Sequence, residues 1–188
     1  MLTNDKLRFA GIGPRKTPAH VLAQMTEIGR IFAQAGWVGV SGFANGADQA
    51  WMAAVPQKQQ EIWLPWWTYN DAREYEDIEG RFHKVSMSNE IHAVARNCYK
   101  GDWEKLTGGA KLLFTRNVAI MARDTLDTPV NLVAYWQDPK DIDNAFGGTN
   151  HALRVAAAAG IPSFNIGVDK DLNAMSDLVT RLTEALPK

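Results

Sequence analysis

The sequence contains no long apolar run and has one cysteine, Cys98. A lone cysteine cannot form a disulfide within its own chain, and this composition is typical of proteins from a reducing compartment. Crossing a membrane takes roughly 20 consecutive apolar residues, which this chain lacks. The first residues also lack the apolar core of a signal peptide. We therefore predict a cytoplasmic protein that does not associate with a membrane.

An excess of one charge and a clustering of metal ligands are also missing. The formal net charge is -1, so any binding of nucleic acid must depend on a local basic patch. The four histidines are scattered without the spacing of metal ligands, and no serine stands in a nucleophile-elbow pattern. The sequence predicts neither a metal site nor a cofactor, and the catalytic residues of any enzyme activity stay unassigned.

What the sequence does contain is a strand-turn-helix-strand-turn pattern over residues 9–48. An apolar run at 7–12 ends in a glycine turn, and Thr17 followed by Pro18 predicts a helix start with a hydroxyl cap. Val21, Met25 and Phe32 then recur at helical spacing until Gly36, after which residues 37–40 read as a buried parallel strand. This is the pattern of a βαβ unit.

Strand-helix alternation continues to the end of the chain, with further strands predicted at 61–64, 130–135 and 163–166. We predict one domain, residues 1–188, of the α/β class with a Rossmann-like, doubly wound and mostly parallel sheet. The expected strand order is 3-2-1-4-5, with a helical insertion at 68–125 between strands three and four. The order would place the switch point between strands one and four.

Three glycine turns at the carboxyl ends of these strands are expected to meet in one crevice. Backbone N–H groups and helix dipoles at such turns favour a phosphate. Arg15 and Lys16 would add positive charge, and Asp48 would accept from a sugar hydroxyl or cap its own helix. The candidate ligand-binding residues are Gly11, Gly13, Pro14, Arg15, Lys16, Ser41, Gly42, Asn45, Gly46, Asp48, Arg116, Asn117, Gly147, Gly148, Thr149 and Asn150.

Four segments carry a resemblance to a known family: FAGIGPR at 9–15, SGFANGAD at 41–48, FTRN at 114–117 and GGT at 147–149. They resemble the Rossmann-like domain of the DNA-processing protein A (Smf) family, in a superfamily shared with the lysine decarboxylase-like LOG proteins. The resemblance implies binding of nucleotides, nucleotide-derived signals or single-stranded DNA. Some members of the superfamily hydrolyse the N-glycosidic bond of a nucleoside monophosphate.

The chain differs from these relatives at three positions. Asn45 and Val118 stand where the DNA binders carry basic residues, and Ala152 stands where the hydrolases have their catalytic glutamate. Our first prediction is therefore a nucleotide or nucleotide-derived phosphorylated ligand. The alternative is single-stranded DNA, with Trp66 or Trp67 stacking on bases. The second alternative is hydrolysis of a nucleotide N-glycosidic or phosphate bond by an aspartate from 138–143.

Two further expectations concern the whole chain. Apolar faces left over on the insertion predict a homodimer. The absence of the extra domains that are common in the family would fit a phage or mobile-element gene.

Overall fold

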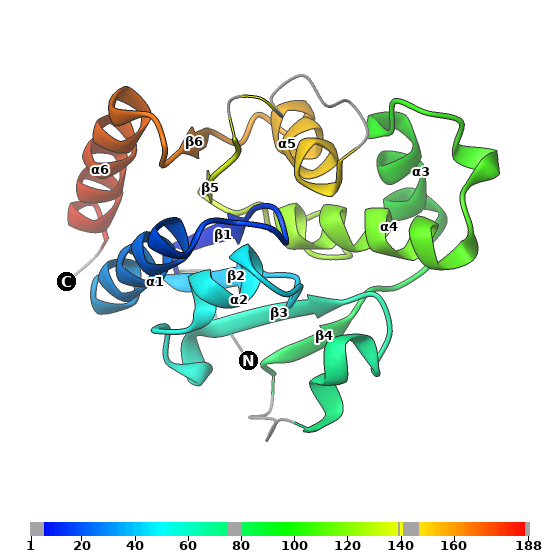
Figure 1. Cartoon of the computed structure of the whole chain (residues 1–188), viewed down its shortest axis with the longest axis horizontal. Helices are drawn as coiled ribbons and strands as arrows, with labels where there is room; N and C mark the ends of the chain where they lie inside the picture. Colours follow the sequence, from blue (N-terminus) through cyan, green and yellow to red (C-terminus); the bar gives the residue numbers. More distant parts are fainter. Residues whose placement is uncertain (1–5, 75–79, 139, 141–146, 187–188) are drawn as a thin grey trace.

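The computed structural model describes residues 6–74, 80–138, 140 and 147–186 (Figure 1). The strands are β1 (Arg8–Ile12), β2 (Val38–Ser41), β3 (Gln60–Leu64), β4 (Phe82–Lys84), β5 (Leu132–Tyr135) and β6 (Ser163–Asn165). The helices are α1 (Ala19–Gln34), α2 (Ala47–Met52), α3 (Asn89–Cys98), α4 (Gly108–Ala122), α5 (Gly148–Ala158) and α6 (Asp169–Glu184). Short 3-10 helices lie at Gln57–Gln59, Tyr69–Glu74 and Trp103–Lys105. In these ranges, every helix is too short or too polar to cross a membrane.

The strands form one sheet in the order β4-β3-β2-β1-β5-β6, and every neighbouring pair is parallel. The α/β, Rossmann-like class is thus confirmed. The predicted order 3-2-1-4-5 is incomplete, because β4 adds a sixth strand at the edge beside β3. The five predicted strands keep their relative order, and the direction of winding reverses between β1 and β5.

Side chains alternate between two apolar layers on opposite faces of the sheet. Phe9 packs with α1, α2 and α6, whereas its neighbour Ala10 packs with α3, α4 and α5. On β3, Ile62 and Leu64 face the first layer and Trp63 faces the second. Figure 1 shows α6 beside α1, with α3, α4 and α5 grouped together. Both faces are therefore covered, as expected for parallel strands.

The helix boundaries confirm most of the local signals and correct one. Gly36 ends the α1 region with a positive φ of 84°, and Ser88 caps α3 by accepting from the Ile91 amide. Thr17 does not cap α1: its hydroxyl donates to the carbonyl of Pro14, and Pro18 takes the cap position without a side-chain bond. Because the Thr17 hydroxyl is engaged with this carbonyl, it does not accept a hydrogen bond from the first N–H groups of α1.

The predicted insertion at 68–125 is also corrected, because it is not purely helical. It contains β4, which joins the sheet through the pairing of Ile62 with Phe82, and α4, which packs against the sheet and α5. Because β4 has only three residues, its alternation of apolar and polar residues is too short to identify a strand from the sequence. Residues 75–79, part of an expected acidic helix or loop, lie outside the described residues.

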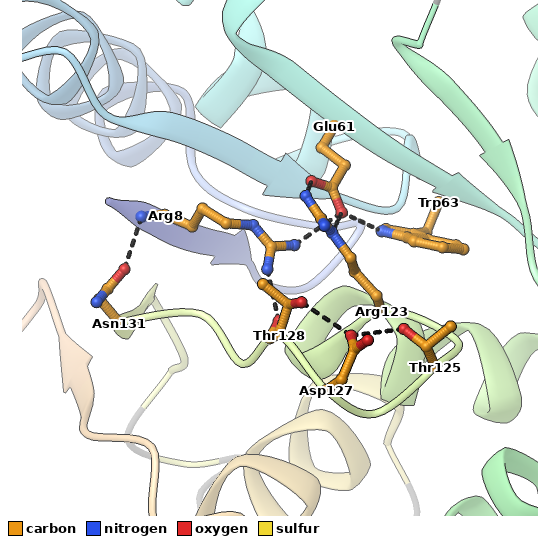
Figure 2. Close-up of polar contacts among 8 residues, drawn as sticks. All are labelled: Arg8, Glu61, Trp63, Arg123, Thr125, Asp127, Thr128 and Asn131. Atoms are coloured by element: carbon orange, nitrogen blue, oxygen red, sulfur yellow. Dashed lines mark hydrogen bonds and ion pairs between the residues drawn. The ribbon is translucent and has the colours of Figure 1, made fainter. Parts of the chain in front are cut away.

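A buried ionic cluster lies at the amino ends of the strands, away from the predicted crevice (Figure 2). Glu61 accepts from Arg8 at 2.7 Å, from Arg123 at 3.1 and 3.2 Å and from the Trp63 indole at 2.9 Å. Arg8 also donates to the carbonyl of Thr128. These contacts, the Glu61 cluster, join β1 and β3 to the end of α4.

Candidate functional site

The carboxyl ends of β1 and β5 open into a crevice of about 430 Å³. All three predicted turns reach it, together with one face of α4. Its lining residues are Ile12, Gly13, Pro14, Arg15, Ala44, Asp48, Ala110, Leu113, Phe114, Arg116, Asn117, Ile120, Gln137, Gly147, Gly148, Thr149, Asn150 and Ala152. Ten of the sixteen candidate residues are therefore brought together there: Gly13, Pro14, Arg15, Asp48, Arg116, Asn117, Gly147, Gly148, Thr149 and Asn150.

Gly11 and Ser41 belong to the framework beneath the crevice. The Ser41 hydroxyl donates to the Gly11 carbonyl at 2.7 Å, which ties the end of β2 to β1. A Cβ at Gly11 would come within 2.5 Å of the Trp51 ring, which also donates from its indole to the carbonyl of Ile12. Gly11 is needed for this close packing, and neither residue lines the crevice.

Gly46 holds the second turn against the first. Its φ is 87°, and a Cβ there would lie 2.3 Å from the carbonyl oxygen of Arg15. Only glycine combines that backbone conformation with so close an approach. The Ala47 amide then donates to Pro14 at 3.4 Å. Gly46 therefore positions the backbone of Arg15 without lining the crevice itself.

A buried ion pair closes the inner wall of the crevice. Arg116 Nη1 lies 3.3 Å from Asp48 Oδ2, and both side chains are under 10 % exposed. The Ala44 amide donates to the same oxygen at 3.2 Å. A Cβ on Gly42 would fall 1.2 Å from Arg116 Nη1, so the guanidinium occupies the space that a side chain at 42 would need.

Electrostatics at this pair are dominated by burial. Burial raises the pKa of Asp48, although the charge of Arg116 and the amide of Ala44 act to lower it. The Nε of Arg116 is buried and has no hydrogen-bond partner among the described residues. Arg116 also lies over the Tyr69 ring, 5.7 Å from its centroid. Its charge is thus committed to Asp48. Among the described residues that line the crevice, Arg15 is the cation without an ion pair.

Arg15 and Lys16 are both exposed, but only Arg15 lines the crevice. Arg15 donates to the Tyr69 hydroxyl at 3.3 Å, and no ion pair involves either residue within the described ranges. Asn45 lies outside the crevice, where its Oδ1 accepts from Asn70 at 2.7 Å. The structure therefore keeps Arg15 at the mouth and places Lys16 and Asn45 beyond it.

Sequence reasoning missed most of the apolar lining. Ala110, Leu113, Phe114 and Ile120 come from α4 at the i, i+3 and i+4 spacing of one helix face, so periodicity could have identified them. Gln137 follows β5 just as the predicted turns follow their strands. No sequence pattern identifies Tyr69, whose hydroxyl accepts a hydrogen bond from Arg15.

His151, one of the four scattered histidines, is fully buried. It contacts α3 through the Ala95 carbonyl and α4 through Asn117. Two residues of the expected hydrolytic loop, Asp141 and Asp143, lie outside the described residues. Hydrolysis stays a prediction. The described residues contain no group of His, Cys, Asp or Glu that could hold a metal ion.

The crevice can accept an anion at the amino end of α5. Gly147, Gly148 and Thr149 at this end line the crevice, and the cap residue Gly147 has no side-chain hydrogen bond, so the helix dipole favours an anion there. Arg15, on the turn after β1, adds a positive charge to the lining. An apolar wall from α4 faces this polar side.

The fold and site define a class: a doubly wound parallel α/β protein with a crevice at its switch point. Among solved structures, one similar chain is DNA processing protein A from Helicobacter pylori, whose structure concerns its single-stranded DNA binding mode. The identity is 22 %, the TM-score is 0.57, and the match covers 86 % of this chain but 66 % of that one. This supports the predicted likeness to the fold of DNA processing protein A, and the LOG resemblance stays a prediction.

No protein-family model and no curated protein matches the chain.

Proposed function

We propose that this protein binds single-stranded DNA, with one nucleotide unit of the strand seated in the crevice. The observation that carries the proposal is the meeting of the amino end of α5, which has no side-chain cap, with the glycine turn at 13–15 and the side chain of Arg15 at one opening. A DNA phosphate would lie there, and a base would lie toward the apolar face of α4. A volume of about 430 Å³ is in the range of sites for small ligands.

Aromatic side chains beside Arg15 support a strand over a free nucleotide. Tyr69 accepts from Arg15, and Trp66 packs edge-on against Tyr69 with ring centroids 5.4 Å apart. The adjacent Trp67 is 51 % exposed, which is unusual for so large an apolar side chain. An exposed tryptophan that follows Trp66 directly in the chain suits stacking on a base outside the crevice. The similarity in fold to a protein that binds single-stranded DNA points the same way.

The test measures the affinity of a fluorescent oligothymidylate by anisotropy at low salt. Gly148→Val should weaken binding at least tenfold, because Gly148 lines the crevice, no described residue lies within 4 Å of a Cβ there, and the added side chain would take up space that the ligand needs. Gly108→Val is the matched control. It also changes the first residue of a helix with no neighbour within 4 Å, but it does not line the crevice. Equal affinity for both variants would overturn the proposal.

Gly13, which also lines the crevice, is a less informative position for this test. A Cβ there would lie 2.7 Å from the Cβ of Ala47. A branched side chain would therefore strain the packing of the first turn against α2 as well as block a ligand.

The second candidate is a free nucleotide or nucleotide-derived molecule, our first prediction from the sequence. The enclosed inner wall favours it, because the buried Asp48 and Arg116 face a hollow of one nucleotide's size. A thermal-shift screen with mono-, di- and triphosphates separates the two. A ligand at about a hundred times its dissociation constant adds roughly 2.7 kcal/mol of stability. A shift with one nucleotide and none with the oligonucleotide would favour this candidate.

A further inference from the structure

A buried histidine behind the wall of the crevice is used by none of the proposed contacts. His151 is on α5, has no exposed surface and packs 4.7 Å from the Phe114 ring. Its Nε2 lies 2.9 Å from the carbonyl oxygen of Ala95, and its Nδ1 lies 3.4 Å from the amide nitrogen of Asn117. The ring thus connects α3 with a residue that lines the crevice.

These contacts determine which ring nitrogen carries the proton. Burial lowers the pKa of His151 to about 4, so the ring is neutral near pH 7 and has one N–H group. A carbonyl oxygen can only accept, so the proton is on Nε2. Nδ1 is then an acceptor, and it needs a donor from Asn117.

The orientation of the Asn117 amide follows from the histidine. Its nitrogen is close to two acceptors, His151 Nδ1 at 3.4 Å and the Gly148 carbonyl at 3.2 Å. Both of its N–H groups are used in this way, and the opposite orientation would bring Oδ1 against both acceptors. Oδ1 accepts from no described residue, and Asn117 lines the crevice.

We propose that His151 is a positioning residue that holds Asn117 Oδ1 toward the crevice, so that the crevice selects a nucleobase with an N–H group. This inference rests on the proposed function, in which a nucleotide unit occupies the crevice. An acceptor oxygen repels phosphate, which places the phosphate near Arg15. The base then lies along Asn117 and the apolar side chains Phe114 and Ile120.

The test compares two five-residue oligonucleotides, one with thymine and one with 3-methylthymine at every position. The methyl group replaces the one N–H of thymine without changing the backbone charge. The hydrogen bond from the thymine N–H to Asn117 Oδ1 should make the wild-type protein bind the thymine strand about three- to tenfold more tightly than the methylated strand. Asn117→Leu and His151→Phe should both bring the ratio of the two affinities close to one.

Two variants separate positioning from general damage to the fold. His151→Gln offers one donor and one acceptor and should recover part of the preference. His92→Phe is the matched control, because His92 contacts Trp103 and Thr115 but does not line the crevice. It should keep the wild-type ratio.

The outcomes are distinguishable from failure of the proposed function. Wild-type protein that binds neither strand overturns the proposed function, and base selection with it. Wild-type protein that binds both strands equally, or an Asn117→Leu variant that keeps the preference, overturns the inference alone. A ¹⁵N spectrum showing His151 protonated on Nδ1 near pH 7 would also overturn it.

Discussion

Gly42 shows how the absence of a side chain determines where a buried charge lies. The guanidinium of Arg116 fills the space beside Gly42 and reaches Asp48, whose carboxylate has little contact with solvent. The sequence motif at 41–48 identified Gly42 and Asp48 as ligand contacts. The structure shows that Gly42 instead makes room for the partner of Asp48.

Gly42→Ala should therefore destabilise the protein by about 3 kcal/mol, because it displaces Arg116 and leaves Asp48 buried without its cation. Chemical denaturation measures the loss. Gly108→Ala, where a Cβ meets nothing within 4 Å, is the control. Adding Asp48→Asn to Gly42→Ala should recover part of the loss, since no buried charge is then unpaired. If the losses of stability caused by Gly42→Ala and by Asp48→Asn simply add in the double variant, Arg116 is not displaced.

The Glu61 cluster makes stability depend on pH. Burial raises the pKa of Glu61, but the charges and hydrogen bonds of Arg8 and Arg123 together bring that pKa below its usual value of 4.5. A carboxylate with a lowered folded pKa stabilises the protein above about pH 4.5. That contribution is lost as the pH falls through the folded pKa.

Glu61→Gln should lower the free energy of unfolding by about 3 kcal/mol at pH 7, because Arg8 stays buried without a counter-charge. The difference from wild type should shrink below pH 4.5 in denaturation experiments. The raised pKa of Asp48 gives stability the opposite dependence on pH. Asp48 is present in both the wild type and the Glu61→Gln variant, so its contribution cancels in their difference. Glu104→Gln is the control, since that exposed residue pairs only at the surface. If the difference in the free energy of unfolding between wild type and Glu61→Gln does not change with pH, the lowered pKa of Glu61 is contradicted.

At the scale of elements, the helix amino ends differ in how they are capped. Ser88 and Thr107 cap α3 and α4 with their hydroxyl groups, whereas α1 and α5 begin without a side-chain cap, and only the α5 end is among the described residues that line the crevice. The sequence predicted a cap at Thr17, and this prediction is wrong. A cap requires a particular backbone geometry, which the residue type alone does not specify.

Thr107→Ala should cost about 1 kcal/mol of stability, because the Ala110 amide loses its 3.2 Å acceptor at the start of α4. Thr180→Ala is the matched control. This exposed threonine lies inside α6, where alanine has the higher helix propensity and stability should be unchanged or slightly higher. Thermal unfolding of both variants checks the prediction, and equal effects would show that Thr107 is not a cap.

At the scale of the whole molecule, a net charge of -1 limits how DNA can be bound. Attraction must come from a few residues. Among the described residues, Arg15 at the mouth of the crevice and its neighbour Lys16 just beyond it are exposed cations without an ion pair. Homodimer formation and a phage origin stay predictions. The large apolar side chains exposed in the described part of the chain include Ile31, Trp67, Met87 and Val168.

The salt dependence of oligothymidylate binding should accordingly be shallow. Two phosphate contacts predict a slope of about -1.4 for the logarithm of affinity against the logarithm of salt concentration. Arg15→Ala should bring that slope to about -0.7. Anisotropy titrations between 50 and 200 mM salt measure both values, and Lys58→Ala, remote in the 3-10 helix before β3, is the control. A slope steeper than -4 would show that more cations than Arg15 and Lys16 contact the strand.

The sequence by itself determined the fold class, the order of five strands and ten of the residues that line the crevice. These follow from local signals, because hydrophobic period, glycine turns and strand ends are written in neighbouring residues. Only the tertiary structure decided that β4 joins the sheet edge, that Arg116 pairs with Asp48 across 68 residues, and that His151 orients Asn117. Such contacts depend on how distant elements pack, and no pattern within one segment encodes them.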